Sequence, residues 1–371
     1  MSCVRNESQQ TPCVLVDAAT LRRNVASMAE VARGHGVALR PHVKTHKMPP
    51  VARLQLEAGA SGITVAKVSE AEVMVRGGAR DVFIAFPLVT EDKILRAIEL
   101  GREARMILAV DSPEGAEILQ RTAERAGVSL EVRLELDTGL RRTGVPFERA
   151  GEMAEEVARF PNLDLTGIYT YRGYVMRDGS PTMDLEAAGL EEGRMMVAAA
   201  EEMRGRGIEI GDVSLGSTPT ARYAAGVEGV TEIRPGTYVF NDVMQARLGA
   251  CSLDECALSV LATVVSRPAP DLAIIDGGSK TFATDIQPGR PPLHLEGFGH
   301  VLDHPGAVLE RVMEEHGMLR VDPADELGVG DTVRVIPNHA CSTVNLHDSV
   351  VLLDGAGGSQ TLLVEARGGV R

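Results

Sequence analysis

The chain reads Arg40-Pro41-His42-Val43-Lys44-Thr45-His46-Lys47 directly after a short apolar segment, Val37-Ala38-Leu39, and before a helical pattern. A lysine where a first strand ends can present its amine at the mouth of an α/β barrel. There the Lys44 amine can form a Schiff base with an aldehyde cofactor. Taken alone, the octapeptide also fits a solvated basic loop. Lys47, one helical turn further on, is expected to be solvated.

Composition limits the class of protein. The 371 residues are 44% hydrophobic and 24% charged, which is ordinary for a globular protein and long enough for two domains. The formal net charge of −14 argues against nucleic acid and against an anionic membrane surface. We therefore expect no nucleic-acid partner and no membrane partner.

The lack of a recognisable targeting signal and the pattern of cysteines predict a cytoplasmic protein. The N-terminal residues lack the apolar core of a signal peptide, and no apolar run is long enough to span a bilayer. The five cysteines are odd in number and widely spread, which fits free thiols in a reducing cytoplasm. They are Cys3, Cys13, Cys251, Cys256 and Cys341. We interpret Cys251 and Cys256 as structural, because no second Cys/His pair lies nearby.

Short apolar runs alternate with helical patterns through the first two thirds of the chain. The expected strands are 37–43, 62–67, 81–86, 105–111, 130–137, 163–171, 208–215 and 232–240. The expected helices are 20–33, 48–58, 69–76, 91–100, 113–126, 146–159, 184–206 and 219–225. The strands are rich in Val, Ile and Leu, as strands buried on both faces should be. Eight strand–helix units predict an α/β fold, a (β/α)8 TIM barrel over residues 20–246, with a doubly wound open sheet as the alternative.

The pattern changes after Arg247. Short β-rich runs separated by Gly, Pro and Asp clusters predict a mostly antiparallel β domain over residues 247–371. Its expected strands are 256–266, 272–276, 332–336, 349–354 and 361–366. One helix is expected at Pro305–His316. Cys13–Asp17 has no role in the barrel, so residues 1–19 can join the β domain.

Two loops at the expected barrel mouth are suited to a phosphate group. The loops after strands seven and eight often bind phosphate in such barrels. Gly216-Ser217-Thr218 and Gly236-Thr237-Tyr238 supply small residues and hydroxyls at these two places. Each loop alone also fits ordinary turn chemistry. Together with Lys44, they favour a phosphorylated aldehyde, pyridoxal 5′-phosphate (PLP).

These motifs resemble the alanine-racemase-like, fold-type III class of PLP enzymes, and within it the D-threonine aldolase/D-serine dehydratase family. The signatures occur in order along nearly the whole chain. They are Pro41-His42-Val43-Lys44-Thr45-His46-Lys47, Asp137-Thr138-Gly139 with Arg142, Gly216-Ser217-Thr218-Pro219-Thr220, Arg234-Pro235-Gly236-Thr237-Tyr238 and Pro337-Asn338-His339-Ala340-Cys341.

The resemblance implies roles for several residues. Lys44 would carry the cofactor and act as the base at Cα, and Arg142 would lie near the phenolic oxygen of PLP. Tyr171 would sit against the pyridine ring, although a lone tyrosine is more often a core residue. Arg234 would lie near the pyridine nitrogen, and a structural role for this Pro-Gly region is almost as well supported. The cofactor-binding set is completed by Ser217, Thr218, Gly236, Thr237 and Tyr238.

A second site is indicated at His339-x-Cys341. In an extended segment, residues two apart point to the same face, so one imidazole and one thiolate can reach one metal ion. Two protein ligands leave room for water and substrate, and this pair favours zinc over Mn²⁺ or Mg²⁺. By spacing alone a structural cysteine is the commoner case, but the resemblance implies a metal-binding His-x-Cys or His-x-Asp here. His347 and Asp348 can support the metal ligands or form a surface turn.

The ligand pair bears on the reaction. His-x-Cys is similar to the D-serine dehydratase branch, so we favour a lyase that converts D-serine, D-threonine or 3-hydroxyaspartate to a 2-oxo acid and ammonia. The alternative is a D-threonine aldolase that yields glycine and an aldehyde, and a more distant one is a non-catalytic PLP-binding protein. A two-base racemase is disfavoured. That mechanism needs a second base, usually a tyrosine, from the C-terminal domain, and no tyrosine follows Val239. The resemblance also implies a homodimer.

Overall fold

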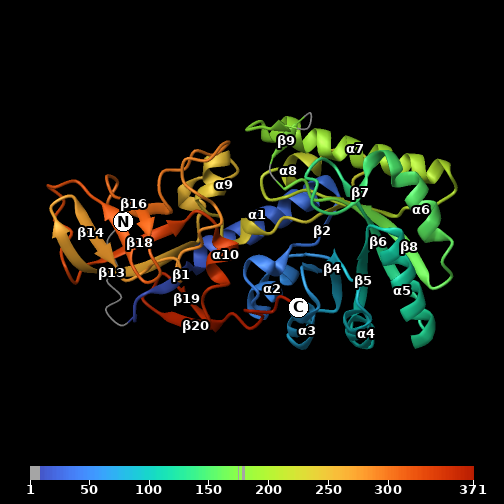
Figure 1. The fold of residues 1–371 in the computed structure, drawn as a ribbon, viewed down its shortest axis with the longest axis horizontal. Helices are drawn as coiled ribbons and strands as arrows, with labels where there is room; N and C mark the ends of the chain where they lie inside the picture. The colour runs from blue at the N-terminus through green and yellow to red at the C-terminus, as the bar shows by residue number, and fades with distance from the viewer. Residues whose placement is uncertain (1–8, 174, 178–179) are drawn as a thin grey trace. The chain divides into compact units, whose positions relative to one another are not determined.

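The computed structural model describes residues 9–173, 175–177 and 180–371 (Figure 1). These residues form two compact units. The barrel unit contains Ala26–Lys44, Pro49–Gly236 and Gly369–Arg371; the β unit contains the described residues up to Val25, Thr45–Met48 and Thr237–Gly368. The domain ranges 20–246 and 247–371 stay predictions.

Eight parallel strands form the barrel unit in the order β2-β12-β11-β8-β6-β5-β4-β3. They are β2 (Ala38–Leu39), β3 (Ile63–Val65), β4 (Asp81–Pro87), β5 (Arg105–Val110), β6 (Leu130–Asp137), β8 (Leu163–Tyr169), β11 (Asp212–Leu215) and β12 (Glu232–Ile233). A parallel bridge between His42, just after β2, and Thr64 in β3 joins the two ends of this order. The ring of strands confirms the predicted barrel and excludes the open sheet.

Helices alternate with these strands, as the sequence predicts. They are α1 (Ala18–His35), α2 (Pro49–Glu57), α3 (Val68–Arg76), α4 (Glu91–Leu100), α5 (Pro113–Ala126), α6 (Ala150–Ala158), α7 (Leu185–Gly205) and α8 (Ala221–Ala224). Local signals explain their ends, since Ser112 Oγ accepts a hydrogen bond from Gly115 N and Gly127 closes α5 at φ 67°. Within the described ranges, no helix is long and apolar enough to cross a membrane.

Two kinds of core stabilise the barrel unit. An apolar layer packs strand residues such as Val82 and Leu134 together with helix residues such as Leu119 and Met196. A smaller aromatic group includes Phe83 and Tyr169, whose ring centroids lie 4.9 Å apart at 88°. The sequence predicts the first core from its apolar runs.

Buried charges form a further part of the barrel unit. Arg133 is only 1% exposed, and its Nη1 donates to Glu232 Oε1 at 2.6 Å. Arg40 Nε donates to the other oxygen of Glu232 at 2.6 Å. Ser214 Oγ also donates to Glu232, and Arg133 Nη2 pairs with Asp212 at 2.6 Å. Burial alone would raise the pKa of Glu232, but Arg133 and Arg40 lower it to about 2.

The β unit contains a mostly antiparallel sheet. Its order is β14-β17-β16-β15-β18-β13-β1-β19-β20, and β14 also pairs with β13, which closes six of these strands into a small barrel. The strands are β1 (Cys13–Asp17), β13 (Leu258–Ala269), β14 (Leu272–Ile275), β15 (Gly299–Leu302), β16 (Val308–Val312), β17 (Gly317–Arg320), β18 (Thr332–Pro337), β19 (Ser349–Leu353) and β20 (Ser359–Leu363). The sequence places Cys13–Asp17 here correctly, since β1 pairs with β13 and β19.

Short elements complete the two units. The helices α9 (Val243–Leu248) and α10 (Ala340–Val344) and the 3-10 turns η3 (Thr237–Val239) and η4 (Leu253–Glu255) belong to the β unit. The turn η2 (Phe147–Arg149) and the short strands β7 (Val145–Pro146), β9 (Met176–Arg177) and β10 (Ser180–Pro181) belong to the barrel unit. The turn η1 (Val43–Thr45) carries Lys44.

The helix predicted at Pro305–His316 is wrong. This segment contains the strand β16, which pairs with β17 in a hairpin through Leu309 and Leu319. The i, i+4 spacing of Val308 and Val312 imitates a helical face, but both β-branched residues enter the sheet. Pairing with the neighbouring strand of the hairpin overrides the local pattern here.

Candidate active site

Two predicted site residues, Lys44 and Arg142, lie beside the aromatic ring of a third, Tyr171. Lys44 is half-buried in η1, and its Nζ lies 5.2 Å from the centroid of the Tyr171 ring. Arg142 Cζ lies 4.9 Å from the same centroid. Lys44 follows β2 while Tyr171 and Arg142 follow β8 and β6, so each comes from the carboxyl end of a different strand.

His42 adds to this cluster, although the sequence suggested no role for it. Its Nδ1 accepts a hydrogen bond from Lys44 N at 3.4 Å, and its side chain is buried. Burial lowers the pKa of His42 well below its usual range, and the charges of Lys44, Arg234 and Arg142 lower it further. His42 is therefore neutral at physiological pH, and its pKa reports a positive potential at the strand ends.

Arg234 is held firmly within the barrel unit. Its Nε donates to Ser214 Oγ at 2.8 Å, and its Nη2 donates to the carbonyl of Thr170. Its guanidinium also lies 5.1 Å from the centroid of the Tyr169 ring. Burial lowers the pKa of Arg234 from its ordinary value. These contacts fix the orientation of Arg234, while its role at a pyridine nitrogen stays a prediction.

Glu135 is a second residue that sequence patterns did not single out. It lies in β6, nearly fully buried, and accepts hydrogen bonds from Tyr169 OH at 2.8 Å and Thr143 Oγ1 at 2.9 Å. Arg142 Nη2 lies 4.0 Å from Glu135 Oε1. Burial raises the pKa of Glu135 from its ordinary value. Glu135 offers a partner for Arg142, whose side chain is otherwise 52% exposed.

The loop after β11 contains the first predicted phosphate-binding segment. Gly216 has φ 83°, and a Cβ there would approach Ala221 Cα to 3.0 Å, so a side chain at this position would be strained. Ser217 is half-buried, Thr218 is buried, and Ser217 N donates to Thr220 Oγ1 at 3.1 Å. The turn is thus held compact, with two hydroxyl-bearing residues next to a glycine.

The second predicted segment crosses from one unit to the other along the chain. Gly236 ends the barrel unit, and Thr237 and Tyr238 begin η3 in the β unit. Gly236 and Thr237 are half-buried, while Tyr238 is buried at 3% exposure. Thr237 Oγ1 shares a hydrogen bond of 3.5 Å with Cys341 Sγ.

The structure brings His339 and Cys341 together, but not in the extended conformation that the sequence suggested. His339 has extended dihedral angles (φ −137°, ψ 108°) and is the N-cap of α10, and Cys341 lies inside this helix. Asn345 N donates to Cys341 O, as a helix requires. The two side chains nevertheless influence each other's ionisation, since the charge of Cys341 raises the pKa of His339 and the charge of His339 lowers the pKa of Cys341. The helix start replaces the strand because β18 ends at Pro337, before the pair begins.

The Cys341 thiol lies among hydrogen-bonding groups. Thr45 Oγ1 shares a hydrogen bond of 3.2 Å with Cys341 Sγ. Burial opposes ionisation, but the charge of His339 and the hydrogen bonds with Thr237 and Thr45 lower the pKa of the Cys341 thiol. A thiolate is the form of cysteine that binds a metal ion.

His339 is surrounded by acidic groups. Asp285 Oδ2 lies 2.6 Å from His339 Nδ1, and the buried Asp242 accepts a hydrogen bond from Ala340 N at 2.9 Å. Burial opposes protonation, but Cys341 and Asp285 raise the pKa of His339 well above its usual range. In the part of the chain that the structure describes, no group of three or more His, Cys, Asp or Glu residues is arranged to hold a metal ion.

Other predicted residues have different environments. Lys47 is buried at 7% exposure, so the prediction that it is solvated is wrong. Its backbone turns with φ 56°, and its carbonyl accepts a hydrogen bond from Ala366 N, which draws this residue into the β unit. His347 Nε2 and the Thr281 carbonyl share a hydrogen bond of 3.1 Å, and Asp348 pairs with Arg367 at 3.0 Å.

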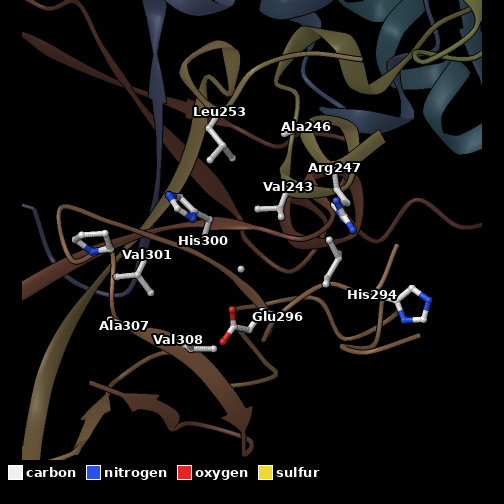
Figure 2. Close-up of a pocket in the computed structure, with 13 residues that line it drawn as sticks. Val243, Ala246, Arg247, Leu253, His294, Glu296, His300, Val301, Ala307 and Val308 are labelled. Carbon is white, nitrogen blue, oxygen red and sulfur yellow. The ribbon is translucent and has the colours of Figure 1, made fainter. Parts of the chain in front are cut away.

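A cavity of about 420 Å³ lies in the β unit, between α9 and the strands β15 and β16 (Figure 2). Arg247, His294, Glu296 and His300 contribute polar groups, and Val243 belongs to its apolar wall. Arg247 Nε donates to the Leu293 carbonyl at 2.9 Å. None of the predicted site residues lines this cavity, so the chemistry proposed below does not depend on it.

Comparison with known proteins agrees with this arrangement. Residues 16–243 match the family described as "Alanine racemase, N-terminal domain", and residues 257–353 match the "Putative serine dehydratase domain". The first match alone covers more than half of the 371 residues. The chain belongs to the alanine racemase N-terminal domain family. PLP fits this family, and the relatives of this chain are lyases.

Two curated members of the family match most of the chain. The D-threo-3-hydroxyaspartate dehydratase of Delftia sp. (strain HT23) is 36% identical over 90% of this chain and 91% of its own length. The D-threonine aldolase of Arthrobacter sp. is 33% identical over 92% of this chain and 89% of its own length. A solved structure of a cysteine-to-alanine mutant of D-threo-3-hydroxyaspartate dehydratase, in the metal-free form, has a TM-score of 0.89 at 34% identity and covers 96% of this chain and 97% of its own.

The residues present fit the groups expected in this family. A half-buried lysine and an arginine beside one aromatic ring suit an aldehyde that carries a phenolic oxygen. The imidazole and the acidified thiol of His339 and Cys341 are a donor pair suited to a soft or borderline divalent ion.

Proposed function

We propose that this enzyme is a PLP- and metal-dependent lyase for D-β-hydroxy amino acids, and that it eliminates water to give a 2-oxo acid and ammonia. The imidazole of His339 and the thiol of Cys341, two residues apart at the start of α10 in a chain of this family, carry the proposal. The Delftia relative named as a dehydratase supports it.

The barrel unit would hold the cofactor and move one proton. When bound, PLP supplies an electron sink that stabilises negative charge at Cα of the substrate. Lys44 would bind the cofactor and remove the Cα proton, and Tyr171 would pack against the cofactor ring. Arg142 and Arg234 would orient the phenolic oxygen and the pyridine nitrogen. Ser217, Thr218, Gly236, Thr237 and Tyr238 would hold the phosphate.

The β unit would supply the metal ligands. His339 and Cys341 would hold a divalent ion, with zinc favoured over Mn²⁺ and Mg²⁺ because thiolate and imidazole are its preferred ligands. Such an ion acts as a Lewis acid at a hydroxyl group. The metal-free structure of a cysteine-to-alanine mutant of a dehydratase relative supports a metal in the family.

Product analysis tests the proposal. Purified protein loaded with PLP and zinc would be incubated with D-threonine, and L-threonine would serve as the control. Elimination gives 2-oxobutyrate and ammonia, the expected result. Glycine and acetaldehyde would instead show retro-aldol cleavage, the second candidate, which the aldolase relative from Arthrobacter supports. If neither set of products forms, the result would favour the non-catalytic PLP-binding alternative.

The proposal also includes a homodimer and a cytoplasmic location. The described cysteines Cys13, Cys251, Cys256 and Cys341 are all free thiols, which supports a reducing compartment. Sedimentation equilibrium of the PLP-loaded protein would measure twice the monomer mass if the enzyme is a dimer.

A further inference from the structure

A carboxylate approaches the metal-ligand histidine from its Nδ1 side. Asp285 Oδ2 lies 2.6 Å from His339 Nδ1, a distance typical of a charge-assisted hydrogen bond. Ser342 Oγ donates to the same Asp285 oxygen at 3.0 Å and lies 3.2 Å from His339 Nδ1. Asp285 therefore has two partners that fix its position.

An imidazole has two ring nitrogens, and each accommodates one strong partner. With Nδ1–H donating to Asp285, Nε2 is the nitrogen of His339 that remains for a metal ion. We propose that Asp285 is a positioning residue that commits His339 to bind the metal through Nε2 and fixes the plane of its ring. This inference rests on the proposed metal-dependent function.

A second carboxylate fixes the backbone between the two ligands. Asp242 is fully buried, and its Oδ2 accepts the hydrogen bond from Ala340 N at 2.9 Å. Its Oδ1 accepts from Gln245 N at 2.9 Å and so caps α9. The segment from His339 to Cys341 is therefore held at its backbone by Asp242, and the His339 ring is held by Asp285.

The geometry separates positioning from direct ligation. The two nitrogens of an imidazole face away from each other, so a carboxylate bonded to Nδ1 lies on the opposite side of the ring from an ion bound to Nε2. Asp285 thus acts on the metal through His339, where it raises the basicity of the ring. Sequence gave no signal for this residue, since 54 positions separate it from His339.

The test is zinc affinity, measured by competition with a chromophoric chelator on PLP-loaded protein. Removing an outer partner of a histidine ligand typically weakens metal binding about 10- to 100-fold. We expect this loss in Asp285→Ala, and a smaller loss in Asp285→Asn, because the amide oxygen can still accept from Nδ1–H. Asp303→Asn is the matched control, since Asp303 is a half-exposed carboxylate of the same unit that pairs with Arg334. The PLP absorbance should be the same in all of these variants.

X-ray absorption of the zinc-loaded proteins completes the test. The same number of oxygen, nitrogen and sulfur ligands in wild type and Asp285→Ala supports positioning, whereas loss of one oxygen ligand would make Asp285 a ligand itself and overturn the inference. Unchanged zinc affinity in Asp285→Ala, alongside a loss in Cys341→Ala, would overturn the inference alone. Wild-type protein that holds PLP but no zinc would overturn both the inference and the proposed metal site.

Discussion

The two sets of candidate catalytic residues have opposite electrostatic surroundings. The strand-end cluster is defined as Lys44, Arg142, Arg234, His42 and Tyr171. Burial lowers the pKa of His42 well below its usual range, and the charges of Lys44, Arg234 and Arg142 lower it further. The metal pair, His339 and Cys341, lies among acidic groups, and the pKa of His339 is raised well above its usual range. The charged neighbours of the two histidines thus shift their pKa values in opposite directions.

This contrast matches the charge of the expected ligands. A phenolic oxygen of the proposed cofactor would be stabilised where Lys44 and Arg142 gather, while a divalent cation would be stabilised beside a thiolate and carboxylates. One chain therefore separates two kinds of ligand by the sign of the charge around each set of residues.

Removal of the Lys44 amine should have the largest effect. Lys44→Ala should abolish the visible absorbance of bound PLP and lower kcat by about 10²–10⁴-fold, because the chain loses both the covalent anchor and the base. Absorbance spectra and initial rates measure this. Lys47→Ala is the comparison variant, since Lys47 lies three residues away in the other unit. A PLP band that survives in Lys44→Ala and disappears in Lys47→Ala would contradict the assignment.

Loss of the Cys341 thiol should impair metal binding and leave PLP binding unchanged. Cys341→Ala should keep the PLP spectrum but lose zinc-dependent turnover by at least about 10²-fold, because a Lewis acid contributes several kcal/mol to such a step. Chelation of the wild-type protein should have the same effect, and added zinc should restore only the wild type. Full activity of Cys341→Ala without metal would exclude a metal mechanism.

Local signals in the sequence explain why the barrel was predictable. The helix α5 begins and ends as predicted because Ser112, Pro113 and Gly127 act within one turn of its ends. The proximity of Lys44 and Tyr171 was predictable because strand ends in a barrel meet at one rim, so position along the chain gives position in space.

Long-range pairing explains what the sequence missed. The segment Pro305–His316 has a helical spacing, but its pairing with β17 decides its structure. The burial of Arg133 and Glu232 depends on partners from different strands. Asp285 approaches His339 from a loop that no spacing rule connects to it. The contacts of Arg133, Glu232 and Asp285 join residues far apart in the chain, and the strand β16 is decided by its pairing in a hairpin. The periodicity of a single segment describes neither kind of contact.

Substitution of the buried Glu232 tests how much its ion pairs with Arg40 and Arg133 stabilise the barrel unit. Glu232→Gln would leave Arg40 and Arg133 each without one buried partner, and breaking a buried ion pair costs about 3–5 kcal/mol. We expect the free energy of unfolding to fall by about 3 kcal/mol, the lower end of this range, because Arg40 still pairs with Asp81 and Arg133 still pairs with Asp212. Urea unfolding monitored by circular dichroism measures the change.

An exposed ion pair of the same unit provides the control. Glu201 pairs with Arg204 on α7 and is 64% exposed, so Glu201→Gln should change stability by less than about 1 kcal/mol. Equal effects of Glu201→Gln and Glu232→Gln would show that the buried network does not stabilise the barrel unit more than a surface pair does.

The same carboxylate predicts a smaller effect of acid. The pKa of Glu232 falls from 4.5 to about 2 on folding, because Arg133 and Arg40 outweigh burial. Its contribution to stability is therefore complete above pH 4.5 and is lost as the pH falls toward 2, since the unfolded chain binds the proton first. At 1.36 kcal/mol per pH unit, the loss between pH 4.5 and 3 is about 2 kcal/mol. Wild type should lose this much more than Glu232→Gln, which has no proton to gain, when both are unfolded in urea across this range. Parallel losses in the two proteins would mean that other carboxylates govern acid unfolding and that Glu232 is not held ionised by its arginines.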